Sequence, residues 1–277
     1  MGYSVLEEPR FLLMGSGMRS GYLISMIYDI SSEFTIISEG NRVGMDGIRL
    51  NRFISEAGVA SRRAADRMVE EGRVSINGRT AVLGDKVAEG DEVRVDGRVI
   101  VAKRRDIVIA FNKPRGITCT SSPEDPDNVI DYIGYPERIY SIGRLDKDSE
   151  GLLLLTNNGD LANAVMRSRG EHEKEYVVTV DHDITDSFVR RMSDGVEILG
   201  RTTKRCEVER ISDREFRIVL RQGLNRQIRR MCGKLGYTVE RLRRVRIMNI
   251  RLGDLPSGEY RDLTEEEKEE LCRKALE

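Results

Sequence analysis

The sequence is poor in the residues that build metal sites, disulfide frameworks and broad aromatic surfaces. Its 277 residues contain no tryptophan, two histidines and four cysteines, and aromatic residues make up only 5% of the chain. The cysteines lack CxxC spacing and the histidines are too few for a metal centre, so we predict reduced thiols and no metal. A hydrolase triad with His172 or His182 is a weak alternative, because no GxSxG motif accompanies either histidine.

A long hydrophobic run is also missing. No stretch approaches the ~18 consecutive apolar residues of a membrane span, and the apolar residues 22–30 include Asp29. Two glutamates precede that run and no small-residue cleavage site follows it, unlike a signal peptide. We therefore predict a cytoplasmic protein that does not contact the membrane. Residues 1–46 are expected to form a poorly ordered extension, with a short packed strand pair as the alternative.

An excess of one charge is the third absence. The net charge is −1 although 34% of the residues are charged. Attraction to phosphate would therefore have to come from local clusters rather than from the whole chain. Residues 221–251 form such a cluster, with ten Arg or Lys against the single acid Glu240. This pattern favours salt-dependent nucleic-acid binding over a solvated helix face.

The first well-patterned segment combines two short helices with several turns. Leu50 and Ile54 recur at helical spacing before a glycine interrupts the pattern. Ser61 is a good N-cap for a second helix over residues 62–70. The strand-like pieces RVSING, AVLGDKV and DEVRVDG follow, separated by glycine-containing turns. We predict a small α/β module over residues 47–104.

Arginines gather on the second helix and just after it. Arg62 and Arg63 stand at the start of the helix, where the helix dipole disfavours cations, so phosphate contacts explain them better than solvation does. Arg67 lies on the same predicted face and Arg73 follows at the strand edge. We predict that all four contact nucleic-acid phosphates. Because acidic residues are interleaved, a solvated charged face is the alternative.

The segment LNRFISEAGVASRRAADRMVEEGRVSINGR closely resembles the S4 RNA-binding domain. In that family the start of the second helix and the following hairpin face RNA. The resemblance implies binding of folded RNA and says nothing about chemistry.

Beyond the basic segment 103–105 the pattern changes to alternating strands and helices without a regular βαβ repeat. We predict an α+β catalytic domain over residues 105–265, with a mixed, largely antiparallel sheet. A separate acidic helix is expected over residues 266–277. Thr264 and Glu267 have the spacing of a capping box at its start.

Residues 143–151, GRLDKDSEG, form a polar loop bounded by glycines between two apolar strands. Functional groups tend to lie on such loops, although its charges also fit a solvated turn. The following LLLLTNNGDLAN continues the strand, turns at Asn158–Gly159 and begins a helix that we expect Asp160 to cap. As a whole the string resembles the central motif of the RsuA/RluB/RluE/RluF family of ribosomal RNA pseudouridine synthases.

Other segments agree with this resemblance in order and spacing, namely NKPRG, EKEYVVTVD and GLNRQIRRMCGKLGY. The resemblance is closest to the RluF branch and spans about residues 47–263. It implies that Asp146 is the indispensable carboxylate, Tyr176 the active-site tyrosine and Arg229 the active-site arginine. Arg229 is thereby the expected charge partner of Asp146.

Three more arginines near these motifs are predicted RNA contacts: Arg144, Arg226 and Arg230. The implied reaction breaks the N-glycosidic bond of a uridine, turns the base and rejoins it through carbon. It requires no cofactor, and it requires the uridine to leave the RNA stack.

We therefore predict an RNA pseudouridine synthase, an isomerase that acts on large-subunit (23S) ribosomal RNA and works as a monomer. Transfer RNA is an alternative substrate. A non-catalytic RNA-binding or ribosome-assembly factor is the alternative from another functional class.

Overall fold

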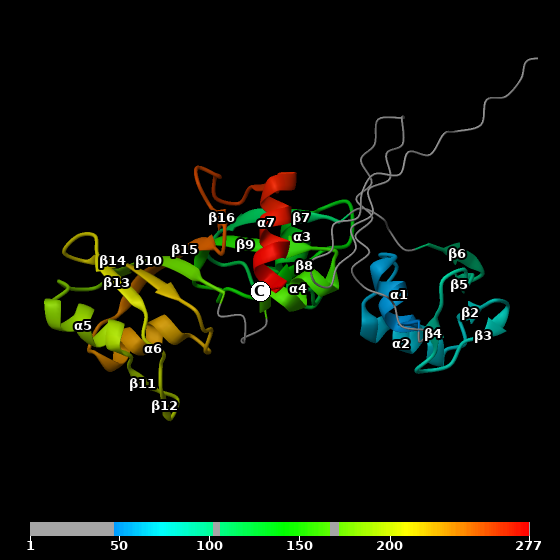
Figure 1. Ribbon diagram of the computed structural model, residues 1–277, viewed down its shortest axis with the longest axis horizontal. Coiled ribbons are helices and arrows are strands. Elements are labelled where there is room, and N and C mark those ends of the chain that lie inside the picture. Colours follow the sequence, from blue (N-terminus) through cyan, green and yellow to red (C-terminus); the bar gives the residue numbers. More distant parts are fainter. Residues whose placement is uncertain (1–46, 102–105, 167–171, 277) are drawn as a thin grey trace, which may run out of the picture.

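The computed structural model describes residues 47–101, 106–166 and 172–276 (Figure 1). The predicted N-terminal extension, residues 1–46, lies outside the described residues.

The first part of the described chain is a small module of two helices and short strands around its own core. Ser61 caps α2 (Arg62–Glu70) through its side chain, which accepts a hydrogen bond from the Ala64 amide at 3.1 Å, as its sequence position predicts. Leu50, Ile54 and Val69 are buried in the module's core. The elements are β1 (Ile48–Arg49), α1 (Leu50–Glu56), α2 (Arg62–Glu70), β2 (Val74–Ile76), β3 (Arg79–Thr80), β4 (Lys86–Val87), β5 (Val93–Val95) and β6 (Arg98–Ile100).

The second part is built on a mixed sheet of nine strands in the order β13-β14-β10-β15-β9-β7-β17, with β16 beside β15 and β8 beside β9. The elements are β7 (Val108–Lys113), α3 (Val129–Ile133), β8 (Tyr140–Ile142), β9 (Glu150–Thr156), α4 (Gly159–Met166), β10 (Lys174–Val180), α5 (Asp186–Asp194), β11 (Glu197–Ile198), β12 (Arg201–Thr202), β13 (Glu207–Arg210), β14 (Glu215–Leu220), α6 (Gln227–Lys234), β15 (Val239–Ile247), β16 (Ile250–Arg251), β17 (Tyr260–Asp262) and α7 (Glu265–Leu276).

Two half-sheets meet inside this sheet. Within each half the neighbouring strands are antiparallel, whereas β9 and β15 join the halves as a parallel pair at only two register positions, Arg243 with Glu150 and Arg244 with Gly151. The α+β class with a largely antiparallel sheet is therefore confirmed. This seam between the half-sheets positions the loop that precedes β9.

The half-sheet of β7 and β9 is covered on both faces, which explains the uninterrupted LLLL run. Leu152 and Leu154 pack into a cluster with α4 and α7, whereas Leu153 and Leu155 pack into a cluster with α3 on the opposite face. The half-sheet of β10 and β14 instead buries one face in its own apolar cluster, and its other face includes the charged residues Glu175 and Arg217.

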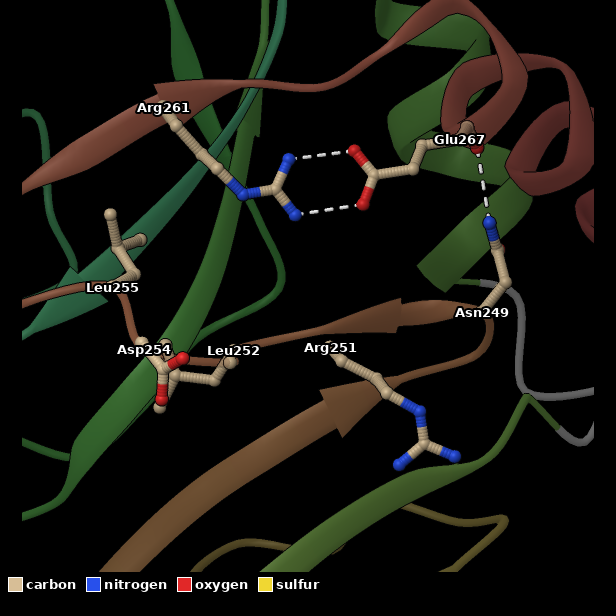
Figure 2. Close-up of a pocket in the computed structure, with 8 residues that line it drawn as sticks. Asn249, Arg251, Leu252, Asp254, Leu255, Arg261 and Glu267 are labelled. Carbon is tan, nitrogen blue, oxygen red and sulfur yellow. Dashed lines mark hydrogen bonds and ion pairs between the residues drawn. The ribbon is translucent and has the colours of Figure 1, made fainter.

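Helix α7 begins as the sequence predicts. The Glu267 amide donates to Thr264 Oγ1 at 3.2 Å and the Thr264 amide donates to Glu267 Oε2 at 3.0 Å, which is a capping box. Figure 2 shows the two-point contact that Arg261 adds to the same carboxylate. Leu271 and Ala275 are buried in the same cluster as Leu152 and Leu154, so this helix packs onto the core beneath the sheet.

The cap of α4 differs from the prediction. Asn158 Oδ1 accepts hydrogen bonds from the amides of Asp160 and Leu161 at 2.9 and 3.0 Å, so Asn158 caps the helix instead of Asp160. Asp160 instead pairs with Arg52 of α1, and Arg138 donates to Ser55 of the same helix at 3.0 Å. These two contacts join the N-terminal module to the part of the chain that forms the nine-stranded sheet.

Candidate active site

The loop with Asp146 leaves the sheet at the seam between the half-sheets. It connects the antiparallel strands β8 and β9, and β9 then runs directly beside β15. Gly151 makes this approach possible: a Cβ atom there would lie 2.3 Å from the Arg244 carbonyl oxygen, and its φ is +99°. Only glycine fits such a backbone without displacement.

Asp146 lies beside a guanidinium, although a different one from the arginine we predicted. Its Oδ2 is 3.6 Å from Arg226 Nη1, and its side chain is 32% exposed. No ion pair with Arg229 is found among the described residues. The charge of Arg229 still interacts with that of Asp146, but its ion pair and its hydrogen bonds to the loop go to the following residues, Asp148 and Ser149.

Arg226 is held mainly by a second carboxylate, Asp148. Its Nη1 and Nη2 donate to the two oxygens of Asp148 at 3.2 and 3.1 Å. Burial alone would raise the pKa of Asp148, but the bonds from Arg226 and the nearby charge of Arg229 outweigh it and hold that pKa below its ordinary value. The backbone of Arg226 adopts a left-handed conformation with φ of 50°. Such a backbone in a non-glycine residue is uncommon and often marks functional sites.

The partly buried side chain of Arg229 connects the loop to β15 through hydrogen bonds. Its Nη2 donates to the Asp148 carbonyl at 3.0 Å and to Ser149 Oγ at 3.3 Å, while its Nη1 donates to the Val239 carbonyl at 3.0 Å. Its Nε lies 3.4 Å from Asp148 Oδ2 without the alignment of a hydrogen bond. Because the side chain is only 12% exposed, burial lowers the pKa of Arg229 from its ordinary value.

Tyr176 lies where the cores of the two half-sheets meet. It is half-buried on β10 and packs against both the cluster beneath β10 and β14 and the cluster that contains Leu145. Leu145 directly precedes Asp146, so Tyr176 packs against the cluster that contains the residue next to the predicted carboxylate. In register, Tyr176 pairs with Arg244 of β15.

The arginines predicted to contact RNA differ in whether their guanidinium groups are already bonded to other residues of the protein. Arg144 is exposed and lines a shallow hollow with Thr118, Thr120 and Ser122. Arg230 is bonded to the carbonyl and side chain of Asn225.

The arginines of the N-terminal module that we predicted to contact RNA show the same difference. Arg62, Arg63 and Arg67 of α2 are exposed. Arg73 instead makes a two-point contact with Asp96 and a further bond to Glu71. Its role in the structure is to join two turns of the module.

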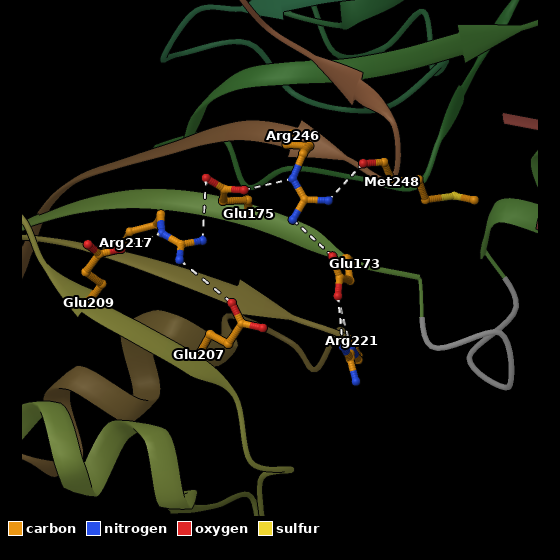
Figure 3. A network of polar contacts seen from close by, with 8 residues as sticks. All are labelled: Glu173, Glu175, Glu207, Glu209, Arg217, Arg221, Arg246 and Met248. Carbon is orange, nitrogen blue, oxygen red and sulfur yellow. Dashed lines mark hydrogen bonds and ion pairs between the residues drawn. The ribbon is translucent and has the colours of Figure 1, made fainter. Parts of the chain in front are cut away.

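The basic segment 221–251 carries less free charge than its composition suggests. Figure 3 shows Arg221 and Arg246 bound to Glu173, with Glu175 between Arg246 and a further arginine of β14. These side chains occupy the solvent face of the half-sheet, opposite Tyr176. Arg221 and Arg246 are therefore compensated by carboxylates and add little free positive charge to this face.

The two histidines are used structurally. The ring of His172 is bonded to the Ala164 carbonyl, and His182 stacks on Tyr237 while its Nδ1 lies 2.9 Å from Asp181 Oδ1. In the part of the chain that the structure describes, no group of His, Cys, Asp and Glu could hold a metal ion, and no helix is long and apolar enough to cross a membrane.

Comparison with known proteins identifies the family. Residues 107–234 match the RNA pseudouridylate synthase family and residues 48–93 match the S4 domain. A relative from Salmonella typhi, named dual-specificity RNA pseudouridine synthase RluF, is 53% identical over 227 residues, which cover 81% of this chain and 78% of the relative. This chain belongs to the RNA pseudouridine synthase family.

Further comparisons agree. The protein of the same name from Escherichia coli K12 is 51% identical to this synthase over 82% of this chain and 79% of the relative. A solved structure described as a pseudouridylate synthase superposes with a TM-score of 0.60 at 29% identity, covering 81% of this chain and all of that one. The chain is therefore an isomerase with an S4 domain and an RNA substrate, and the hydrolase alternative is excluded.

Sequence reasoning missed the role of Asp148 and assigned Arg226 only to RNA contact. The sequence feature that could have indicated the role of Asp148 is the DxD spacing of Asp146 and Asp148, because it places two carboxylates within reach of one guanidinium. Nothing in the local sequence indicated that Arg226, three positions before Arg229, would supply that guanidinium.

Proposed function

We propose that this synthase isomerises uridine in structured RNA of the large ribosomal subunit, with Asp146 as the indispensable carboxylate. The supporting observation is the placement of Asp146 at the seam of the sheet, partly exposed, 3.6 Å from Arg226 and adjacent to Leu145, which packs in one cluster with Tyr176. A carboxylate that serves as a nucleophile or stabilises a separated sugar intermediate must be ionised. The guanidinium of Arg226 compensates that charge.

The target uridine has to leave its stack to reach this carboxylate. Extraction costs a few kcal/mol, and stacking on Tyr176 offsets about 1–3 kcal/mol of it. In this proposal Arg229 orders the loop, while Arg144, Arg62, Arg63 and Arg67 contact RNA phosphates. Phosphate contacts fix the register of the RNA so that one uridine is presented.

The test is tritium release from [5-³H]uridine-labelled ribosomal RNA. The wild-type chain should release tritium from large-subunit RNA, and the Asp146→Asn variant should release none while binding the RNA as tightly. Asp194→Asn, an exposed carboxylate paired with Arg205 on the surface, is the matched control and should remain active. An active Asp146→Asn variant would refute the assignment, and an inactive wild-type chain would favour the non-catalytic assembly factor.

Transfer RNA is the second candidate substrate, since the relatives with 51–53% identity are named dual-specificity enzymes. Labelled transfer RNA in the same assay tests it, and absence of release would limit the synthase to ribosomal RNA.

We also propose that the synthase works in the cytoplasm as a monomer. The four cysteines are free, which fits a reducing compartment. Light scattering should give a mass of 31.5 kDa, and a dimer mass would contradict the monomer. Cell fractionation should recover the protein with the cytosol.

A further inference from the structure

The buried side chain of Arg244 spans the back of the loop that carries Asp146. Arg244 is 3% exposed and lies on β15 between Tyr176 and Gly151. Its Nε donates to the Leu152 carbonyl at 2.7 Å, and its Nη1 lies 3.5 Å from the Arg144 carbonyl. These two carbonyls flank residues 145–151, so one side chain contacts the backbone before and after Asp146.

This guanidinium has no counter-charge among the residues that the structure describes. No carboxylate there forms an ion pair with it, and its Nη2 is buried without a hydrogen-bond partner. Its neighbour Lys174 is a further cation: burial, followed by the charge of Arg244, lowers the pKa of Lys174 to about 8. A buried charge without a partner destabilises a fold, so packing alone does not explain an arginine here.

Arg246, two residues further along the same strand, shows the opposite arrangement. Its side chain is 14% exposed, and it pairs with Glu175 at 2.8 Å and Glu173 at 3.1 Å (Figure 3). The same strand therefore contains one arginine whose charge is compensated and another whose charge is not. The uncompensated one is the arginine that contacts the loop.

We propose that Arg244 is a positioning residue for Asp146, which fixes both ends of the loop so that the carboxylate meets the extruded uridine in one geometry. This inference rests on the proposed role of Asp146. It predicts that the side chain contributes to catalysis and not to stability. Displacing a reacting group by about 1 Å can lower a rate by about 10²-fold.

The experiment compares Arg244→Met with Arg246→Met in steady-state tritium release and thermal unfolding. For Arg244→Met we expect kcat to fall by about 10²-fold, with KM unchanged and a melting temperature equal to or above that of the wild type. Arg246→Met removes the closest ion-pair partner of Glu175 and one of the two arginines bound to Glu173, so its melting temperature should fall while kcat of the folded enzyme is unchanged. A purely structural role for Arg244 would not produce this separation.

Arg244→Lys distinguishes charge from geometry, because an ammonium cannot reach both carbonyls as a planar guanidinium does. We expect it to stay nearly as slow as Arg244→Met, and full activity would overturn the two-point contact. Wild-type kcat in Arg244→Met, or a variant that loses its fold along with its activity, would overturn the proposal. An active Asp146→Asn variant would instead refute the proposed function, so the two failures are distinguishable.

Discussion

The close approach of β9 and β15 makes Gly151→Ala the sharpest test of how the site is built. An alanine Cβ at this position would lie 2.3 Å from the carbonyl oxygen and 2.8 Å from the nitrogen of Arg244. Both contacts are with backbone atoms, so they cannot be relieved by a rotamer change. The two strands would have to separate at the two register positions that join the half-sheets among the described residues.

The loss of stability expected for Gly151→Ala has two contributions. A side chain in the left-handed region costs on the order of 1–3 kcal/mol, and forcing an extra methyl group into a packed contact costs about 1–3 kcal/mol more. Gly236→Ala isolates the first part, because its φ of +90° is similar and a Cβ there would meet nothing within 4 Å. We therefore expect Gly151→Ala to be less stable than Gly236→Ala by about 2 kcal/mol.

Urea unfolding of the two variants and the wild type measures this difference, and tritium release measures its effect on the site. Gly151→Ala should also lose activity under conditions where it is still folded, since the loop with Asp146 leads directly into β9. Equal unfolding free energies for the two alanine variants would refute the steric reasoning.

Other expectations concern charges and thiols. Reversing Arg62 and Arg63 to Glu should weaken RNA binding and lower the slope of log K against log salt by about 2; an unchanged slope would mean that they do not contact phosphate. Lys174→Met should be more stable than the wild type at pH 7, because the folded chain holds the Lys174 pKa at about 8 against an ordinary 10.5. Between pH 8 and 10.5 Lys174 is protonated in the unfolded chain but not in the folded one, so the free energy of unfolding of the wild type rises with pH over this range. The stability difference between Lys174→Met and the wild type should therefore shrink from pH 8 to pH 10.5. A difference that stays constant would contradict this. Burial raises the pKa of Cys232 to about 12, so iodoacetamide should label the exposed Cys272 first, and equal rates would contradict the burial.

Local signals predicted much of the fold. The N-cap at Ser61, the capping box of Thr264 with Glu267 and the apolar run of β9 all correspond to observed elements, because each depends on neighbours within a few residues. The edge strand β13 was missed. Its residues are mostly exposed and charged, and their pairing with Arg217 of the next strand becomes visible only once the sheet is formed.

The charge pairing at the candidate site depends on long-range geometry that the sequence does not reveal. The resemblance led to Asp146 and Tyr176, and the structure places their surroundings in one cluster. The guanidinium beside Asp146 depends on the left-handed backbone of Arg226 and on a contact across 78 positions of the chain to Asp148. Long-range contacts of this kind leave no periodic pattern in a sequence.

The narrow seam also affects the order in which the molecule can form. Arg244 and Leu152 are 92 positions apart, and bringing such distant segments together carries a loop-closure entropy that local hairpins avoid. Local hairpins such as β8–β9 and β13–β14 can therefore form before the parallel junction closes. During refolding, recovery of enzymatic turnover should lag behind recovery of the far-ultraviolet circular dichroism signal, because docking of the two halves creates the working centre last.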